Sequence, residues 1–260
     1  MAGEVRAARE GPIGWIVFDH PERRNALSAN MWGELAEAAR DFALDDAVRV
    51  VVMRGAGETA FISGADISQF AQAEGSETSE ALESGGGNAF RELEQLDKPL
   101  IAMIHGYCIG GGVPVSLAAD MRYASDDAIF AIPAARLGVG YGLGGVEQLA
   151  RLVGLSCAKE ILFSARRYPA GEALAMGLVN RVLPKAELEP FTREMAERIA
   201  ANAPLTVSSV KCIARELGKR HKERDRAAVD AAVRACFESE DFAEGVKAFL
   251  EKRKPAFRGR

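Results

Sequence analysis

The sequence predicts an α/β protein, and three observations support this fold class. Apolar runs such as Val48–Met53 (VRVVVM) and Leu100–Ile104 have the length and composition of buried strands. A helical apolar pattern lies between strand patterns, and loops that contain glycine follow strands directly. Runs that are apolar at every position are typical of a sheet covered on both faces, and a repeated strand–helix–strand order is typical of α/β architecture.

The first unit consists of a strand, a turn and a helix. Residues Gly14–Asp19 (GWIVFD) form the expected strand, and the sequence HPERRNALS forms the turn. Ser28 is a suitable N-cap for the helix that follows. One apolar face is predicted for this helix by the spacing of Met31, Trp32, Leu35, Ala38, Ala39 and Phe42.

A second loop with glycines, RGAGETAFISGADISQF, follows the strand that ends at Met53. Residues 71–88 (AQAEGSETSEALESGGGN) are polar, small and rich in glycine and serine. This composition predicts a mobile segment that covers a site as a flap. A helix near residues 88–96 is then expected to lead into the strand Leu100–Ile104.

Three consecutive glycines, Gly110–Gly112, separate that strand from an apolar stretch of helical length. Glycines at such a junction let the backbone approach a ligand closely, and the first N–H groups of a helix have no partner within the helix. The helix dipole adds to their attraction for negative charge. This arrangement is half of an oxyanion hole. The alternative interpretation is a flexible loop or a close contact between a strand and a helix.

The α/β pattern continues to about residue 200, and beyond that the chain changes character. Residues Met121–Ser125 (MRYAS) read as a strand, and a third glycine cluster, 138–145, precedes another helix. Beyond Asn202-Ala203-Pro204 the pattern is charged and helical, without strand candidates. We therefore expect a core over residues 1–200 and a helical oligomerisation region over residues 201–260, whose apolar stripes pack on the core or on another subunit.

Composition limits the function. The chain has 260 residues, of which 48% are hydrophobic and 27% charged, with a net charge of −4. No basic stripe indicates nucleic acid, no apolar run is long enough for a membrane span, and the N-terminus has no hydrophobic signal core. Four cysteines lack metal-type spacing, so we expect reduced thiols, no metal and a cytoplasmic location.

Four segments in this order resemble the crotonase superfamily, the enoyl-CoA hydratase/isomerase family. They are HPERRNALS, AFISGADI, HGYCIGGG and the tail AFLEKRKPAFRGR. The resemblance covers nearly the whole chain. It implies a spiral of repeated ββα units and a C-terminal helical region that forms trimers, often paired into hexamers.

The resemblance also implies roles for individual residues. The peptide N–H groups of Ala65 and Gly111 would bind the carbonyl of an acyl-CoA thioester and stabilise its enolate. No cofactor is expected, since coenzyme A is the carrier of the substrate. The positions that would contact coenzyme A, the last two commonly from a neighbouring subunit, are Arg24, Ala26, Ser63, Asp66, Ile67, Phe249 and Lys252.

Three positions depart from the family pattern. Hydratases of this family carry one glutamate two residues after the glycine triplet and a second after a proline in the next loop. Here these positions hold Pro114 and Ala134. The aspartate of some other members would fall near Gly142. Neither proline nor alanine transfers a proton, so hydration lacks its usual acid and base.

Decarboxylation of a malonyl-type thioester needs no base, because loss of carbon dioxide itself generates the enolate. Tyr141, in LGVGYGLGG, resembles the methylmalonyl-CoA decarboxylase branch, which carries a tyrosine here. That branch has a histidine where this chain has Ala65. Tyr141 could instead pack against the acyl chain. The other candidate acids and bases, all more typical of structural roles, are Glu147, His105, His20 and Asp120.

Two hypotheses follow from these residues. The first is an acyl-CoA enzyme, a lyase or isomerase, that stabilises a thioester enolate and favours decarboxylation over hydration. The alternative is a non-catalytic acyl-CoA-binding protein that kept the loops and lost the chemistry. A nucleotide-binding domain is disfavoured, because no GxGxxG follows an N-terminal strand and no Walker lysine follows a glycine loop.

Overall fold

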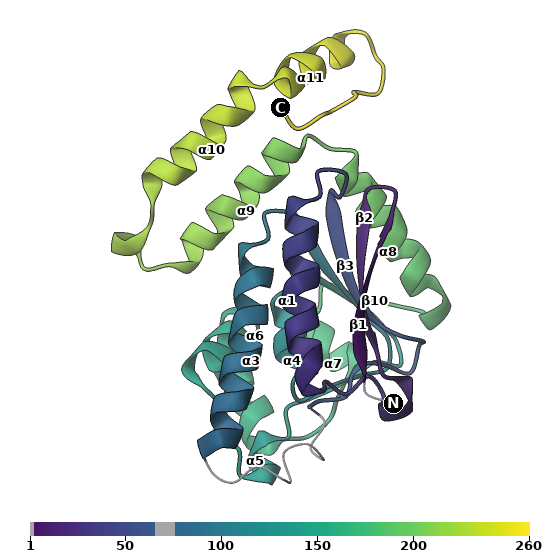
Figure 1. Cartoon of the computed structure of the whole chain (residues 1–260), viewed down its shortest axis with the longest axis vertical. Helices are drawn as coiled ribbons and strands as arrows, with labels where there is room; N and C mark the ends of the chain where they lie inside the picture. The colour runs from purple at the N-terminus through teal and green to yellow at the C-terminus, as the bar shows by residue number, and fades with distance from the viewer. Residues whose placement is uncertain (1–2, 66–75) are drawn as a thin grey trace.

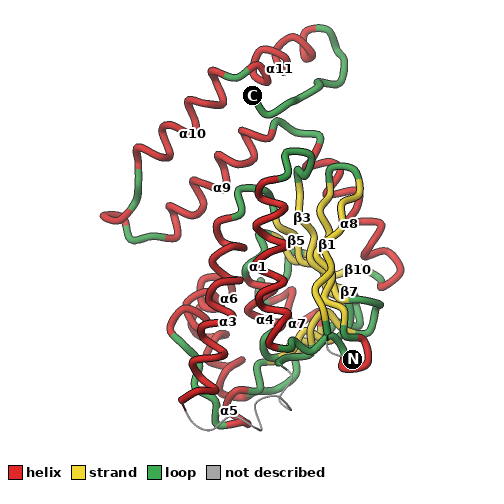
Figure 2. Tube along the Cα trace, viewed as in Figure 1, coloured by secondary structure: helices red, strands yellow, loops and turns green. Residues whose placement is uncertain are grey.

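A six-stranded sheet forms the centre of the structure, a computed structural model that describes residues 3–65 and 76–260, with the backbone alone for 76–85 (Figures 1 and 2). The strand order is β1-β2-β3-β5-β7-β10. β1 is antiparallel to β2, and the other neighbours are parallel. The strands are β1 (Glu4–Glu10), β2 (Ile13–Asp19), β3 (Val50–Gly55), β5 (Leu100–Ile104), β7 (Met121–Ser125) and β10 (Arg181–Leu183).

A second, four-stranded sheet is built from short strands in the order β4-β6-β8-β9. Three of them follow a long strand almost at once, so each repeated unit gives one strand to each sheet. At the corner between β5 and β6, Gly106 has φ +54°, and a Cβ there would lie 2.0 Å from the Thr59 carbonyl oxygen. Only glycine fits this corner. The strands are β4 (Ala60–Ile62), β6 (Tyr107–Ile109), β8 (Ile129–Ala131) and β9 (Tyr168–Pro169).

Helices cover the large sheet on both faces (Figure 1). α8 (Lys185–Ala200) lies on one face, and α1 (Ala29–Leu44) with α3 (Ser76–Gln95) lies on the other. Val50 and Val52 of β3 point toward α8, whereas Val51 and Met53 join the core under α1 and α3. This confirms the prediction that the all-apolar strands belong to a sheet buried on both faces.

α1 confirms the sequence pattern closely. It begins after Ser28, and the predicted apolar face is buried along its whole length. β1 was not predicted. Its residues are mostly exposed and charged, and it is paired throughout with β2, from Glu4 opposite Asp19 to Glu10 opposite Ile13. Charged residues are typical of an edge strand, where only one side has a partner.

Of the segment 71–88, predicted to be a mobile flap, residues 76–88 belong to α3, so the predicted helix near residues 88–96 begins earlier than expected. Residues 71–75 lie outside the described residues. The rings of Trp32 and Phe90 lie 5.7 Å apart between α1 and α3, and Ala89 and Leu93 are fully buried. Packing against α1 outweighs the low helix propensity of the glycine- and serine-rich sequence.

Four further helices complete the core. The helix after the glycine triplet is only six residues long, shorter than the apolar stretch suggested. The longest of the four bends at Gly154, which has φ 76° and ψ 157°. The helices are α4 (Gly112–Leu117), α5 (Ala134–Leu137), α6 (Leu143–Ser164) and α7 (Ala170–Ala175).

The C-terminal segment is helical, as the sequence indicates. α9 (Pro204–Gly218) runs beside the core, and α10 (Arg226–Glu238) and α11 (Glu240–Leu250) lie beyond it, away from the sheets (Figure 1). The Arg49 guanidinium donates to the Phe257 carbonyl oxygen (3.1 Å) and joins the tail to the core. Within the described ranges, no helix combines the length and apolar character that a bilayer crossing requires.

Candidate active site

The candidate site lies where β4 and β6 end. These strands are parallel neighbours, so their carboxyl ends meet at one edge of the small sheet. The loop Ser63–Ala65 follows β4, and the loop Gly110–Gly112 follows β6. A Cβ on Gly110 would lie 3.4 Å from the Gly64 Cα, and one on Gly111 would lie 3.9 Å from the Ala65 nitrogen. The structure therefore brings Ala65 and Gly111 together.

The peptide N–H groups at this edge of the small sheet differ in their hydrogen bonding. The Gly110 N–H donates to the Ala131 carbonyl (2.8 Å), and the Leu27 N–H donates to the Gly64 carbonyl (2.8 Å). Over residues 3–65 and 76–260, we find no acceptor for the Ala65 or Gly111 N–H. Because α4 is short, its dipole is small, and the attraction for an anion comes chiefly from the peptide N–H groups themselves.

The turn after β2, residues 20–28 (HPERRNALS), is held against this edge by Asn25 and is called the first loop below. Arg24 and Asn25 have left-handed backbones, with φ 52° and 58°. The Asn25 amide donates to the carbonyls of Ala56 (3.1 Å) and Ala60 (2.8 Å) and accepts from the His20 N–H (3.0 Å). Asparagine tolerates positive φ better than most residues, which makes this tight turn possible.

Three of the predicted coenzyme A positions lie together at the site. The Ser63 N–H donates to the Arg24 carbonyl (3.1 Å), and Ala26 is buried in the same loop. Asp66 and Ile67 lie outside the described residues. Phe249 is 83% exposed at the end of α11, and Lys252 follows it. α11 lies beyond α9 and α10, far from α4 in space (Figure 1), so within one chain these two residues do not join the site.

Tyr141 lies between α5 and α6, with its ring against Gly145. Its hydroxyl is buried, and among the described residues it has no hydrogen-bond partner. Burial, together with a smaller effect of the nearby Cys108, raises the pKa of Tyr141 to about 12. The hydroxyl is therefore protonated at neutral pH and can donate a hydrogen bond to a ligand.

The two altered positions flank the glycine triplet. Pro114 lies in α4, and Ala134 begins α5, three residues after the Ala131 carbonyl that holds Gly110. Gly142 precedes α6, where Leu143 begins the helix. None of these three residues carries an ionisable group, so none of them can transfer a proton.

The other candidate acids and bases are either buried or engaged with neighbouring residues of the fold. Glu147 is exposed and pairs with Arg151 one turn along α6 (2.7 Å). His105 is 3% exposed, and burial lowers its pKa. His20 Nδ1 contacts the Ala26 carbonyl (3.2 Å), and Asp120 accepts from the Leu100 N–H (2.7 Å).

Sequence reasoning missed two residues that shape the site. Asn25 fixes the first loop, and its signal was an asparagine in a turn without glycine. Tyr107 follows the corner glycine Gly106, and its ring lies under Arg24. Neither was predictable from spacing alone, because each acts on residues distant in sequence or across a turn.

The fold and these loops define the class. The enoyl-CoA hydratase/isomerase family model matches residues 8–260, and the chain belongs to this family. The short-chain-enoyl-CoA hydratase of Clostridium acetobutylicum is 36% identical over 248 residues, covering 95% of this chain and 94% of the relative. The carnitinyl-CoA dehydratase of Salmonella enteritidis is 37% identical and covers 100% of both chains.

Solved structures agree with this assignment. An enoyl-CoA hydratase/carnitine racemase from Magnetospirillum magneticum has a TM-score of 0.94 at 34% identity, over 98% of this chain and 96% of the other. The enoyl-CoA hydratase from Bacillus anthracis has a TM-score of 0.92 at 32% identity, over 98% and 99%. Both the family and the crotonase-like α/β fold predicted from the sequence are therefore confirmed.

Proposed function

We propose that this chain decarboxylates a malonyl-type CoA thioester. The observation that carries the proposal is the combination of adjacent, available N–H groups at Ala65 and Gly111 with non-ionisable residues at Pro114 and Ala134. The two N–H groups of the proposed oxyanion hole lie close together and lack acceptors among the described residues, whereas the glutamates that transfer protons in hydration are replaced. A reaction that generates its own enolate suits this set of residues.

The chemistry requires no cofactor. The bond between the α-carbon and the carboxylate breaks, carbon dioxide leaves, and the electron pair passes into the enolate of the thioester. The Ala65 and Gly111 N–H groups stabilise the negative oxygen of this enolate. The α-carbon then takes a proton from solvent, which gives the shorter acyl thioester.

Tyr141 orients the leaving carboxylate in this proposal. Its buried hydroxyl lacks a partner among the described residues, and a polar group in that state is stabilised by a ligand that supplies one. A substrate carboxylate accepts this hydrogen bond and is held out of the plane of the thioester. The breaking bond then overlaps with the π-system of the carbonyl, as the reaction requires.

The C-terminal helices are proposed to complete the site from another subunit. α10 and α11 expose large apolar side chains, among them Phe237 (65%), Phe249 (83%) and Leu250 (75%). Burial in a trimer or a hexamer removes this surface from water and brings Phe249 and Lys252 to a neighbouring coenzyme A. Light scattering of the full chain measures the assembly, and a monomer at all concentrations would contradict it.

Hydration is the second candidate, because the curated relatives described above include a hydratase and a dehydratase. One preparation is therefore assayed for hydration of crotonyl-CoA and for carbon dioxide release from malonyl-, methylmalonyl- and ethylmalonyl-CoA. We expect decarboxylation of at least one malonyl-type thioester without hydration. In Tyr141→Phe it should fall by about 100-fold, because orientation is lost.

Tyr123→Phe is the matched control. Tyr123 is a buried tyrosine on the face of the large sheet under α8, and its hydroxyl contacts the Met121 sulfur (3.3 Å). Its loss should leave carbon dioxide release unchanged. Hydration of crotonyl-CoA without decarboxylation would contradict the proposal. Tight binding of all four thioesters without turnover would favour the acyl-CoA-binding protein.

A further inference from the structure

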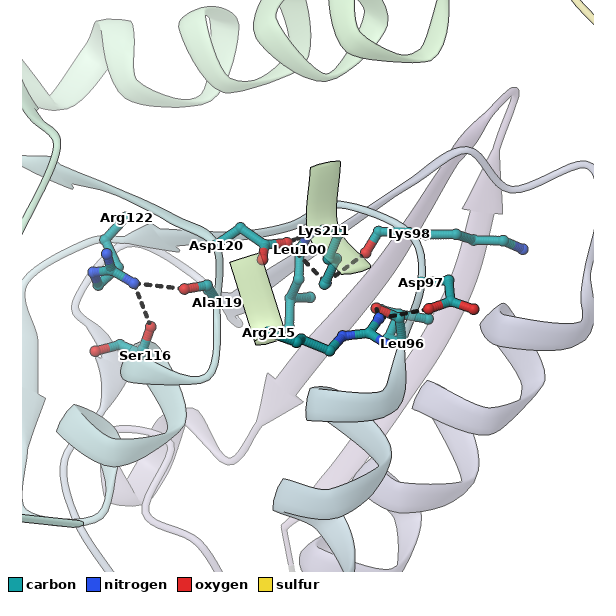
Figure 3. A network of polar contacts seen from close by, with 10 residues as sticks. All are labelled: Leu96, Asp97, Lys98, Leu100, Ser116, Ala119, Asp120, Arg122, Lys211 and Arg215. Atoms are coloured by element: carbon teal, nitrogen blue, oxygen red, sulfur yellow. Dashed lines mark hydrogen bonds and ion pairs between the residues drawn. The ribbon is translucent and has the colours of Figure 1, made fainter. Parts of the chain in front are cut away.

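Arg122 is a buried cation that the proposed reaction does not use. It lies in β7 and is 3% exposed, and all the hydrogen-bond acceptors found for its side chain are carbonyl oxygens. Nε donates to the Leu178 carbonyl (2.9 Å). Nη1 donates to the Ala119 carbonyl (2.6 Å) and more weakly to the Ser116 carbonyl (3.4 Å) (Figure 3).

A guanidinium in this position is expensive to bury. Burial lowers the pKa of Arg122 to about 10, while the Asp120 carboxylate raises it. Arg122 is still charged at neutral pH, so its desolvation is offset mainly by the three carbonyl groups. The Asp120 carboxylate forms its ion pair with Lys211 instead (2.8 Å). The segments that supply the three carbonyl groups therefore show what this buried charge connects.

Two of the three carbonyls belong to the end of the α4 segment. Ser116 lies in the last turn of α4, and Ala119 lies two residues beyond it. Cations favour the carbonyl end of a helix, where the last C=O groups lack intrahelical donors. The third carbonyl, Leu178, belongs to the segment before β10. Arg122 thus joins the end of α4 to the large sheet and to this neighbouring segment.

The backbone of Arg122 is itself held firmly. Arg122 pairs with Ala102 of β5. The Arg122 N–H donates to Asn180 Oδ1 (2.8 Å), and the Asn180 N–H donates to the Arg122 carbonyl (2.8 Å). The guanidinium therefore extends from a fixed strand, and it transmits the position of that strand to α4.

The opposite end of α4 packs tightly against β4. A Cβ on Gly112 would lie 2.5 Å from the Ile62 carbonyl oxygen, so the first helical residue is in close contact with β4. Gly111 precedes it, next to Ala65. Because α4 spans only Gly112–Leu117, a displacement of its carbonyl end is passed directly to Gly111.

We infer that Arg122 is a positioning residue, which through the Ser116 and Ala119 carbonyls holds the Gly111 N–H at the separation from the Ala65 N–H that a thioester oxygen requires. The inference rests on the proposed oxyanion hole but not on decarboxylation as the reaction. It deepens the proposed function by assigning a role to a buried charge outside the two loops of the candidate site.

Lys211 provides a matched control at the same turn. Its Nζ donates to Asp120 Oδ2 (2.8 Å) and to the Lys98 carbonyl (2.8 Å), and it joins α9 to the residues just before β7 (Figure 3). It is a largely buried cation, like Arg122. No hydrogen bond from Lys211 to a carbonyl of residues 112–119 is found in the described structure. Lys211→Met therefore removes a buried cation without releasing α4.

The test measures carbonyl polarisation rather than turnover. Acetyl-CoA labelled with ¹³C at the thioester carbonyl is bound to the full chain, and the shift of its C=O stretch is recorded by infrared difference spectroscopy. Binding of acetyl-CoA and of free CoA is measured by calorimetry, and thermal unfolding is followed for each variant. The variants are Arg122→Met, Arg122→Lys and Lys211→Met.

In the wild type we expect a downshifted C=O stretch. Arg122→Met should lose at least about half of this shift and bind acetyl-CoA about tenfold more weakly, with binding of free CoA nearly unchanged, since one donor of the hole is misplaced. Arg122→Lys should recover part of the carbonyl shift and part of the acetyl-CoA affinity. Its ammonium group reaches one carbonyl but lacks the several N–H donors of the guanidinium. Lys211→Met should keep the shift, even where its unfolding temperature falls.

Three results would overturn the inference. One is an unchanged carbonyl shift in a folded Arg122→Met protein. Another is an equal loss in Lys211→Met, which would mean that any loosening of this turn has the same effect. The third is the absence of a carbonyl shift in the wild type, which would show that Ala65 and Gly111 do not form an oxyanion hole. The carbon dioxide assay stands apart from these results, so a failure of decarboxylation is recognised separately.

Discussion

The guanidinium of Arg24 lies over the ring of Tyr107, with Cζ 5.0 Å from the ring centroid. Arg24 belongs to the first loop and Tyr107 to β6, so this contact joins the first loop to the strand that leads into the loop Gly110–Gly112. An arginine at this position was expected to face coenzyme A, although exposed arginines are commonly solvated and mobile. Stacking on Tyr107 restricts where its charge lies.

Tyr107→Leu should therefore weaken the binding of acetyl-CoA. A cation–π contact at an exposed site contributes about 0.5–1 kcal/mol, which corresponds to a factor of about 2–5 in Kd. Tyr107→Phe keeps the ring and should bind as the wild type does. Calorimetry with acetyl-CoA and with acetyl-pantetheine, which lacks the nucleotide phosphates, checks the assignment. Equal weakening for both ligands would show that the ring does not act through Arg24 and phosphate.

Tyr141→Phe should raise stability while it lowers activity. The substitution removes a buried hydroxyl that lacks a partner in the described part of the chain, and an unsatisfied group of this kind costs about 1–3 kcal/mol. We expect the free energy of unfolding in denaturant to rise by about 1 kcal/mol. Tyr123→Phe should not gain stability, because the Tyr123 hydroxyl already contacts the Met121 sulfur. A loss of stability in Tyr141→Phe would indicate that the hydroxyl has a partner in the free protein.

Gly111→Ala and Gly112→Ala should separate activity from stability. A methyl group on Gly112 meets the Ile62 carbonyl oxygen at 2.5 Å, so overpacking should cost about 1–3 kcal/mol of unfolding free energy. Gly111 has φ −60° and ψ −20°, which alanine adopts without strain. Its methyl group would extend toward the Ala65 nitrogen, 3.9 Å away.

Gly111→Ala should accordingly unfold as the wild type does and yet lose thioester binding. Denaturant unfolding and calorimetry with acetyl-CoA measure the two effects on the same samples. If Gly111→Ala bound acetyl-CoA normally, the oxygen would not lie between Gly111 and Ala65, and the assignment of the hole would be wrong.

The parts of the fold that follow from local periodicity were predictable. Leu100–Ile104 and Met121–Ser125 are strands with the predicted bounds, and the apolar face of α1 is buried as its spacing indicates. The short strands β4, β6 and β8 were not predictable, because three residues carry too little pattern. The full length of α3 was not predictable from its glycine- and serine-rich sequence, because its stability comes from contact with α1.

The candidate site shows the same division. Motifs in the sequence indicated Ala65 and Gly111 as candidates, and the parallel pairing of β4 with β6 explains why their loops meet. The roles of Asn25 and Arg122 depend on carbonyl groups supplied by distant segments, so no spacing in the sequence could indicate them. Phe249 and Lys252 stay predictions that depend on a second subunit.

The C-terminal tail should detach in acid. Glu244 receives two hydrogen bonds from Arg253 and one from the Ala256 N–H (2.8 Å). Hydrogen bonding from Arg253, followed by the Ala256 N–H, lowers the pKa of Glu244 from its ordinary 4.5 to about 2. A depressed carboxyl pKa contributes stability that is complete above 4.5 and is lost as the pH falls toward 2.

Hydrogen exchange at the Ala256 amide should therefore speed up as the pH is lowered from 5 to about 2, after correction for the intrinsic pH dependence of exchange. Glu244→Gln should show fast exchange throughout and little pH dependence, because its amide neither ionises nor pairs with Arg253 through a charge. Exchange at Ser125 in β7 serves as the internal control, since it reports the core. If Ala256 stayed protected at pH 2 in the wild type, the tail would be held by Asp241 and Arg49 rather than by the Glu244 carboxylate.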